Sequence, residues 1–185
     1  MTRRSVTASS VVARRILERC WLTPGSIKYV ARSAPVREIG DLVRMIRSPQ
    51  IEARVKPEAI ATSQVARRDT GLLYTDDPTP EVLVLGDSFM RIYQYDPPEQ
   101  AGFIAHLALA LGCPIAGIVS DGGASTLVRQ DLFRRPKLLS RAKVVVWEFV
   151  ERDIRLGAEG WKIVPLPSAK TSKQAAGIGS APHAF

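Results

Sequence analysis

The stretch that decides the fold lies near the middle of the chain and reads Val82-Leu83-Val84-Leu85-Gly86-Asp87-Ser88-Phe89. Four consecutive apolar residues are typical of a strand buried on both faces, as in a parallel sheet. Gly86 permits a tight exit from that strand, and Ser88 follows three residues after Leu85. Sites in open α/β sheets form beyond the carboxyl ends of the strands, so we expect Ser88 to lie at a functional edge.

Downstream of Ser88, helical and strand patterns alternate. After the strand at residues 81–85, the pattern predicts a helix at 99–112, a strand at 114–120, a helix at 123–135 and a strand at 143–149. This β-α-β-α-β order implies parallel strands with helices on the faces of the sheet. The sequence therefore predicts an α/β fold with a mainly parallel sheet.

Upstream of this region the patterns are weaker. We expect an amphipathic helix at 9–21, an extended segment at 27–36 and a short helix at 41–46. Residues 50–80 read as loop, with at most one helical piece between Pro57 and Val65. The expected organisation is one domain over residues 1–165 and a disordered Ser/Ala/Lys/Gly-rich tail over 166–185.

The bulk composition is that of an ordinary globular protein. The 185 residues are 45% hydrophobic and 24% charged, with a formal net charge of +8 and a pI near 9.9. The basic residues are scattered, which is a weak sign of a partner, so the charge means either an arginine-rich surface or a polyanionic ligand. A nucleic-acid-binding module is not supported, because no basic helix or aromatic–basic interleaving occurs. Cys20 and Cys113 are most simply two buried free thiols, with a disulfide open if the protein is exported.

Ser88 is the candidate nucleophile. A serine held at the strand exit can attack an acyl carbon while its own N–H stabilises the oxyanion. The alternative is a plain turn after the strand, in which Asp87 and Ser88 only cap the next segment.

Further segments extend the pattern around Ser88 beyond a three-residue motif. The match continues through Ala101-Gly102-Phe103-Ile104-Ala105-His106-Leu107, Asp121-Gly122-Gly123-Ala124-Ser125 and Val145-Val146-Trp147-Glu148-Phe149-Val150-Glu151-Arg152-Asp153-Ile154-Arg155. Together these segments resemble the SGNH hydrolase-like domain of the alginate O-acetyltransferase family, the proteins of the AlgJ and AlgX type. The resemblance implies a three-layer α/β/α fold and acetyl transfer through an acetyl-serine to a polysaccharide hydroxyl. It also implies a periplasmic location, an exopolysaccharide such as alginate, other acetylation proteins and a membrane-bound acetyl donor. We expect no cofactor and no metal, and neither cysteine belongs to a C-x-x-C pair that would support a zinc site.

The sequence lacks the motif that supplies the catalytic base in that family. The family carries an Asp-x-His motif ahead of a helix upstream of the serine, and no Asp-x-His occurs in this sequence. His106 reads as a flank residue of a packed helix, and His183 lies in the expected tail. We therefore expect a C-terminal piece of a longer acetyltransferase, without signal peptide or membrane span, in which Ser88 turns over little substrate. A natural pseudo-enzyme that binds polysaccharide or assembles an export complex is the alternative.

The oxyanion hole is the second departure, because the sequence contains no asparagine. The candidates for that role or for substrate contact are Gly122, Gly123, Arg129, Tyr93 and Tyr95. A plain strand-to-helix turn would equally explain the two glycines, and cleft-wall positions would explain the two tyrosines. The charged residues after the third strand read as a structural ion-pair network or a site wall, with Glu148 the least certain because it ends an apolar strand.

Overall fold

A computed structural model describes residues 2–123, 125–157 and 160–166. Its centre is a three-stranded parallel sheet of order β6-β5-β7, built from β5 (Val82–Gly86), β6 (Ile115–Val119) and β7 (Val144–Trp147). The pairing aligns Val82 with Ile115 on one side and with Val144 on the other. All five residues of β5 are buried, which confirms the central strand that the apolar run predicts.

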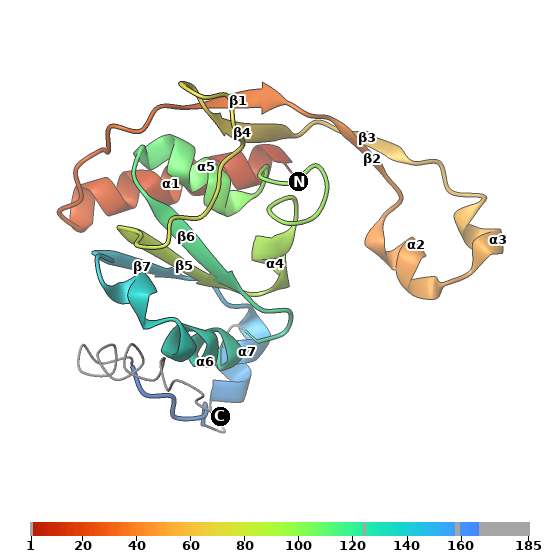
Figure 1. The fold of residues 1–185 in the computed structure, drawn as a ribbon. Coiled ribbons are helices and arrows are strands. Elements are labelled where there is room, and N and C mark those ends of the chain that lie inside the picture. Colours follow the sequence, from red (N-terminus) through yellow and green to blue (C-terminus); the bar gives the residue numbers. More distant parts are fainter. Residues whose placement is uncertain (1, 124, 158–159, 167–185) are drawn as a thin grey trace, which may run out of the picture.

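Helices cover both faces of the sheet, so the predicted three-layer α/β/α fold is confirmed (Figure 1). On one face lie α1 (Thr2–Arg19) and α5 (Phe103–Leu111), which pack against each other. On the other face lie α6 (Leu127–Arg134) and the 3-10 turn η1 (Pro136–Leu139).

Each face has its own apolar cluster. The cluster under α1 and α5 includes Ile16, Val82, Val84 and Leu107, and the cluster under α6 includes Leu83 and Leu85. Alternate residues of β5 thus serve opposite clusters, as the two-residue period of a strand requires. Ser88 therefore follows, two residues later, a strand that is packed on both sides.

The region expected to be loop is where the prediction was wrong. Residues 50–80 contain the end of α3 (Pro49–Glu52) and the strands β3 (Glu58–Ile60) and β4 (Ser63–Arg67). β4 pairs antiparallel with β1 (Tyr29–Ser33), and β3 pairs with β2 (Val36–Glu38). These strands are short and only partly buried, so their sequences carry little periodic signal, and the pairing forms between distant segments.

The two antiparallel pairs lead into an arm. β2 and β3 carry α2 (Asp41–Ile46) and α3 at their far end, and the arm reaches away from the rest of the molecule (Figure 1). Among its apolar side chains, Leu42 is 78% and Met45 is 74% exposed.

The segment before β5 protects the outer edge of β6. The N–H of Asp77 donates to the carbonyl of Ile115 at 2.9 Å, and Tyr74 Oη donates to the same carbonyl at 2.8 Å. The N–H of Gly117 donates to Asp76 Oδ2 at 2.9 Å. Backbone groups of an edge strand that would otherwise invite another chain are thus covered.

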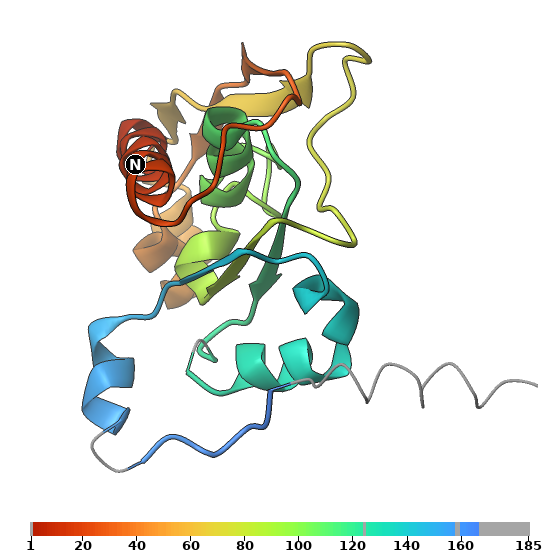
Figure 2. The same ribbon diagram turned by 90° about the vertical axis from the view of Figure 1, so that its left-hand side faces the viewer.

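The described chain ends beyond the sheet with α7 (Glu151–Gly157) and an extended segment that returns toward α6 (Figure 2). The expected tail at 166–185 falls, apart from Leu166, outside the described residues. Both cysteines are free, but only Cys113 is buried, which raises the pKa of its thiol to about 11. The expectation of two buried thiols was wrong for Cys20, which lies exposed just after the last turn of α1. None of the described helices is both long and apolar enough to cross a membrane.

Candidate functional site

Ser88 lies at the carboxyl edge of the central strand. It is the first residue of α4 (Ser88–Arg91), two residues after β5 ends, and its side chain is partly exposed. The strand is locked between two neighbours, so the position of Ser88 is set by packed backbone rather than by a mobile loop.

Asp87 anchors the turn that presents Ser88. Its side chain is fully buried, and Oδ1 accepts a hydrogen bond from the N–H of Phe89 at 2.8 Å. Asp87 therefore caps α4, as the turn alternative in the sequence analysis expected. The cap and the nucleophile position are compatible, because the capping bond uses neither the hydroxyl nor the N–H of Ser88.

Glu148, the residue that follows β7, contacts the same turn with its side chain. Its Oε2 accepts from the N–H of Asp87 at 2.9 Å. Gly86 is needed for this approach, since an added Cβ would lie 3.0 Å from Glu148 Oε2 and 2.3 Å from Met90 Cγ. Burial is the main cause that raises the pKa of Glu148, and the nearby Asp87 carboxylate raises it further. The hydrogen bond from the Asp87 N–H acts in the opposite direction and lowers it. The turn before Ser88 is thus held from both sides by carboxyl groups.

One basic side chain faces this pair. Arg152 of α7 places Nη2 3.7 Å from Asp87 Oδ2, and the Arg152 side chain is 60% exposed. Asp153 on the same helix is buried and is a further negative neighbour of Glu148. The charged run after the third strand therefore includes both an ion pair and a contact to the turn that carries Ser88.

The Gly122–Gly123 turn lies at the same sheet edge as Ser88. The N–H of Ser120, at the end of β6, donates to the carbonyl of Gly86 at 3.0 Å. Arg91 of α4 pairs with Asp121 at 3.3 Å. Gly123 donates its N–H to the carbonyl of Ser120 at 3.1 Å, as a turn residue does. Gly122 has a φ of +68° and open space where a Cβ would lie, whereas a Cβ on Gly123 would lie 2.6 Å from the side chain of Leu127.

Arg129 has contacts of another kind. Its guanidinium lies 5.8 Å from the ring centre of Trp147 and 5.7 Å from that of Trp161, and Nη2 donates to the carbonyl of Lys162 at 2.9 Å. Phe149 completes the aromatic cluster. These contacts give Arg129 a structural role in holding the segment after α7, and none of them involves Ser88.

The two tyrosines differ in their surroundings. Tyr93 is 5% exposed and has a φ of +58° in the turn after α4. Tyr95 is 40% exposed, and the charged group that acts most strongly on its hydroxyl is Asp76, at the covered edge of β6. Burial and the Asp76 carboxylate raise the pKa of Tyr95. The structure thus places Tyr95 beside a structural carboxylate and Tyr93 in the buried wall behind the turn.

His106 is packed away from the sheet edge. It is 3% exposed on α5, and its Nε2 lies 3.0 Å from the carbonyl oxygen of Ser63 on β4. Burial lowers its pKa. The reading of His106 as a packed helix residue agrees with this position, and His183 lies outside the described residues.

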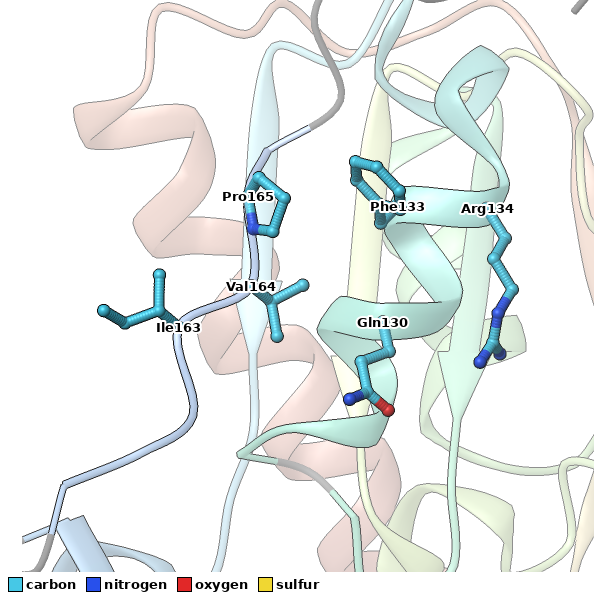
Figure 3. A pocket seen from close by; sticks show the side chains of 6 residues that line it. All are labelled: Gln130, Phe133, Arg134, Ile163, Val164 and Pro165. Carbon is cyan, nitrogen blue, oxygen red and sulfur yellow. The ribbon is translucent and has the colours of Figure 1, made fainter.

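A pocket lies elsewhere in the molecule. It has a volume of about 290 Å³ and lies between α6 and the segment 163–165, with Gln130, Phe133 and Val164 around it (Figure 3). No candidate residue of the sequence analysis lines it. Within the described ranges, no three histidine, cysteine, aspartate or glutamate side chains come together in a way that could hold a metal ion.

The structure thus places Ser88 next to a carboxyl pair that sequence reasoning did not assemble, with the Gly122–Gly123 turn at the same edge of the sheet. Glu148 drew attention only as a charged residue at an apolar strand end, and Asp87 only as a possible cap. The parallel register that pairs Leu85 with Trp147 is what carries Glu148 to the turn. Acyl-transfer chemistry suits this arrangement, since it presents one hydroxyl on a rigid backbone edge.

Comparisons with known proteins agree with this geometry. The family described as the SGNH hydrolase-like domain of acetyltransferase AlgX matches residues 5–151. None of the curated proteins matches the chain.

Two solved structures share the fold. The O-acetyltransferase domain of Pseudomonas putida AlgJ has a TM-score of 0.57 at 19% identity, covering 82% of this chain and 50% of its own. Pseudomonas aeruginosa AlgX has a TM-score of 0.51 at 11% identity, covering 80% of this chain and 33% of its own. The chain therefore spans half of the first structure and a third of the second. With most of its length matched by the family, the chain belongs to the AlgX-type SGNH hydrolase-like acetyltransferase domains.

Proposed function

We propose that this chain carries the serine site of an SGNH-type O-acetyltransferase that acts on an alginate-like polysaccharide. The observation that carries the proposal is the position of Ser88 as the first residue of α4, at the carboxyl edge of a fully buried central strand. Membership of the AlgX-type family and the fold shared with AlgJ support the reaction class.

The proposed reaction has two steps. Ser88 Oγ attacks the carbonyl carbon of an acetyl donor, the bond from the acetyl group to its carrier breaks, and the carrier leaves with the serine proton. A polysaccharide hydroxyl then attacks the acetyl-serine and returns a proton to Ser88. Candidate oxyanion donors are the N–H groups of Ser88 and of the Gly122 turn.

The base that Ser88 needs is not supplied by the described residues. The sequence has no Asp-x-His, and His106 is packed between α5 and β4. We infer that the Asp-His pair comes from outside these 185 residues and that this chain by itself acylates Ser88 slowly. A triad serine without its base loses most of its reactivity.

The proposed acceptor is an exported polyanion. A net charge of +8 suits a uronate-rich chain. A periplasmic location and a membrane-bound acetyl donor are part of the proposal, as the resemblance to the family implies. One observation favours a second function, a non-catalytic subunit that binds polysaccharide or assembles an acetylation complex. That observation is the missing Asp-x-His beside an otherwise intact Ser88 turn.

Hydrolysis of p-nitrophenyl acetate tests the proposal, with intact-mass detection of an acetyl adduct. The variants are Ser88→Ala and, as a matched hydroxyl at the same sheet edge, Ser120→Ala. We expect little serine-dependent turnover, with a slow adduct that Ser88→Ala abolishes and Ser120→Ala retains. Rapid turnover lost in Ser88→Ala would show that the chain contains its own base and would redirect attention to His106. An adduct that persists in Ser88→Ala would refute Ser88 as the acetylated residue, and absence of any adduct would favour the non-catalytic subunit.

A further inference from the structure

The carboxyl group of Asp87 is only half satisfied by the hydrogen bonds around it. Oδ1 accepts from Phe89, but Oδ2, on a side chain with no exposure, has no hydrogen-bond partner among the described residues. A buried carboxylate oxygen without a partner is costly, so something near it should donate a proton.

Glu148 is the group placed to do so. Its Oε2 already accepts from the N–H of Asp87 at 2.9 Å, which places its carboxyl group next to the residue that carries the unpaired Oδ2. Two neighbouring carboxylates in a buried site repel each other when both are ionised. Burial together with Asp87 raises the pKa of Glu148, in agreement with this crowding.

The charges around the pair favour a retained proton. The described charged groups that face it are Asp153 and Arg152, both on α7. Asp153 adds negative charge from a buried position, whereas Arg152 is 60% exposed and 3.7 Å from Asp87 Oδ2. Arg91 of α4 is occupied by ion pairs with Asp96 and Asp121. One screened cation therefore faces three carboxyl groups.

We propose that Asp87 and Glu148 share one proton, with Glu148 donating its O–H to Asp87 Oδ2 while accepting from the N–H of Asp87. The pair then closes a ring of two hydrogen bonds across β5 and β7. The proton stays on Glu148, and no transfer to Ser88 is involved. The role of Glu148 rests on the proposed function of Ser88. With Ser88 as the nucleophile, Glu148 is a positioning residue that acts through Asp87 on the turn that carries Ser88.

The proposal has a definite pH signature. A folded-state pKa above the unfolded value means that the folded protein binds the proton more tightly, so this contribution to stability falls as pH rises above the ordinary glutamate range. Glu148→Gln mimics the protonated acid, since its amide can donate to Asp87 Oδ2 and its carbonyl can accept from the N–H. Glu148→Gln should therefore remove the loss of stability that the wild type shows as pH rises.

The test compares Glu148→Gln, Glu148→Ala and the exposed control Glu151→Gln in the full chain. We measure unfolding in urea between about pH 5 and pH 8 and amide hydrogen exchange at Asp87 and Phe89. Glu148→Gln should keep wild-type exchange and become more stable than wild type as pH rises. Glu148→Ala should speed exchange at both amides by about tenfold, as expected for a lost hydrogen bond of ordinary strength. Glu151→Gln should follow the wild-type pH profile.

Two outcomes would overturn the proposal. If Glu148→Gln damages the turn as much as Glu148→Ala, the ionised carboxylate is what the turn needs. If the Glu148→Gln and wild-type pH profiles are parallel, no proton is shared, and this comparison holds even when Glu148→Ala fails to fold. The readouts do not involve acetylation, so a missing Ser88 adduct would count against the proposed function without touching the proton pair.

Discussion

The side chain of His106 shows how burial changes the behaviour of a single residue. It is held between α5 and β4 with one ring nitrogen near the carbonyl of Ser63, and Nδ1 is buried without a hydrogen-bond partner in the described structure. Such a ring is best accommodated in its neutral form, because an imidazolium there would carry an unsolvated charge.

Stability should therefore fall on acidification through His106. Its folded-state pKa lies below the ordinary 6.5, so the unfolded chain binds the proton first, and the contribution present above 6.5 is lost as pH falls. The loss can reach about 1.4 kcal/mol per pH unit. His106→Gln, which can still donate to Ser63 but does not titrate, should flatten this decline in urea unfolding measured from about pH 7.5 to pH 5.5.

The slope of the free energy of unfolding against pH, and not its absolute value, tests this prediction. A glutamine can pack less well than the imidazole and so lower the free energy of unfolding at every pH. Parallel curves for the wild type and His106→Gln would mean that His106 is not the group responsible for the acid loss.

At the scale of elements, the segment after α7 is held by few contacts. Trp161 packs against Trp147 and Phe149, its Nε1 donates to the carbonyl of Asp153 at 2.9 Å, and Arg129 lies against two of the rings. A planar guanidinium can stack on a ring and donate sideways at once, which an ammonium cannot do.

Replacing Arg129 should loosen this segment and leave the sheet intact. Arg129→Ala loses both stacking contacts and the bond to Lys162, which we expect to cost about 0.5–2 kcal/mol. The expected readout is a red-shifted tryptophan emission with an unchanged far-UV spectrum. Arg129→Lys retains the charge but should behave more like alanine than like arginine, and a lysine variant with wild-type emission would contradict the stacking argument.

At the scale of the whole molecule, the two antiparallel pairs connect the arm to the body (Figure 1). Arg44, Arg47 and Arg54 are exposed on the arm, while β1 and β4, which flank it in sequence, pair with each other in the body (Figure 1). A cut in the arm therefore leaves both sides of the break attached to the same core.

Trypsin should therefore nick the arm before it degrades the body. Denaturing gels should show two fragments that meet between residues 44 and 54, and native size exclusion should show them eluting together. Replacing Arg44, Arg47 and Arg54 by glutamine should abolish the early cut. First cuts within residues 82–147, or separation of the fragments without denaturant, would show that the arm is part of the cooperative body.

The parts of this protein that the sequence determined are those encoded in local composition. The apolar runs of β5 and β6 predict buried parallel strands because a strand covered on both faces must be apolar along its length. The run of β7 predicts a strand too, but β7 lies at the edge of the sheet and is only partly buried. The position of Ser88 follows from the run of β5, since the chain must leave the sheet where the apolar residues end. Helices α1, α5 and α6 were predicted for a similar reason, by their apolar stripes.

What the tertiary structure alone decided depends on which distant segments meet. Short half-exposed strands such as β3 and β4 acquire their pairing from partners across the fold, and local sequence does not specify that choice. Asp87 and Glu148 are separated by 61 positions and meet only because β5 and β7 lie side by side in parallel register. The sequence thus located the turn that carries Ser88, and the packing of the sheet brought Glu148 to that turn, because contacts between distant segments follow from register and not from composition.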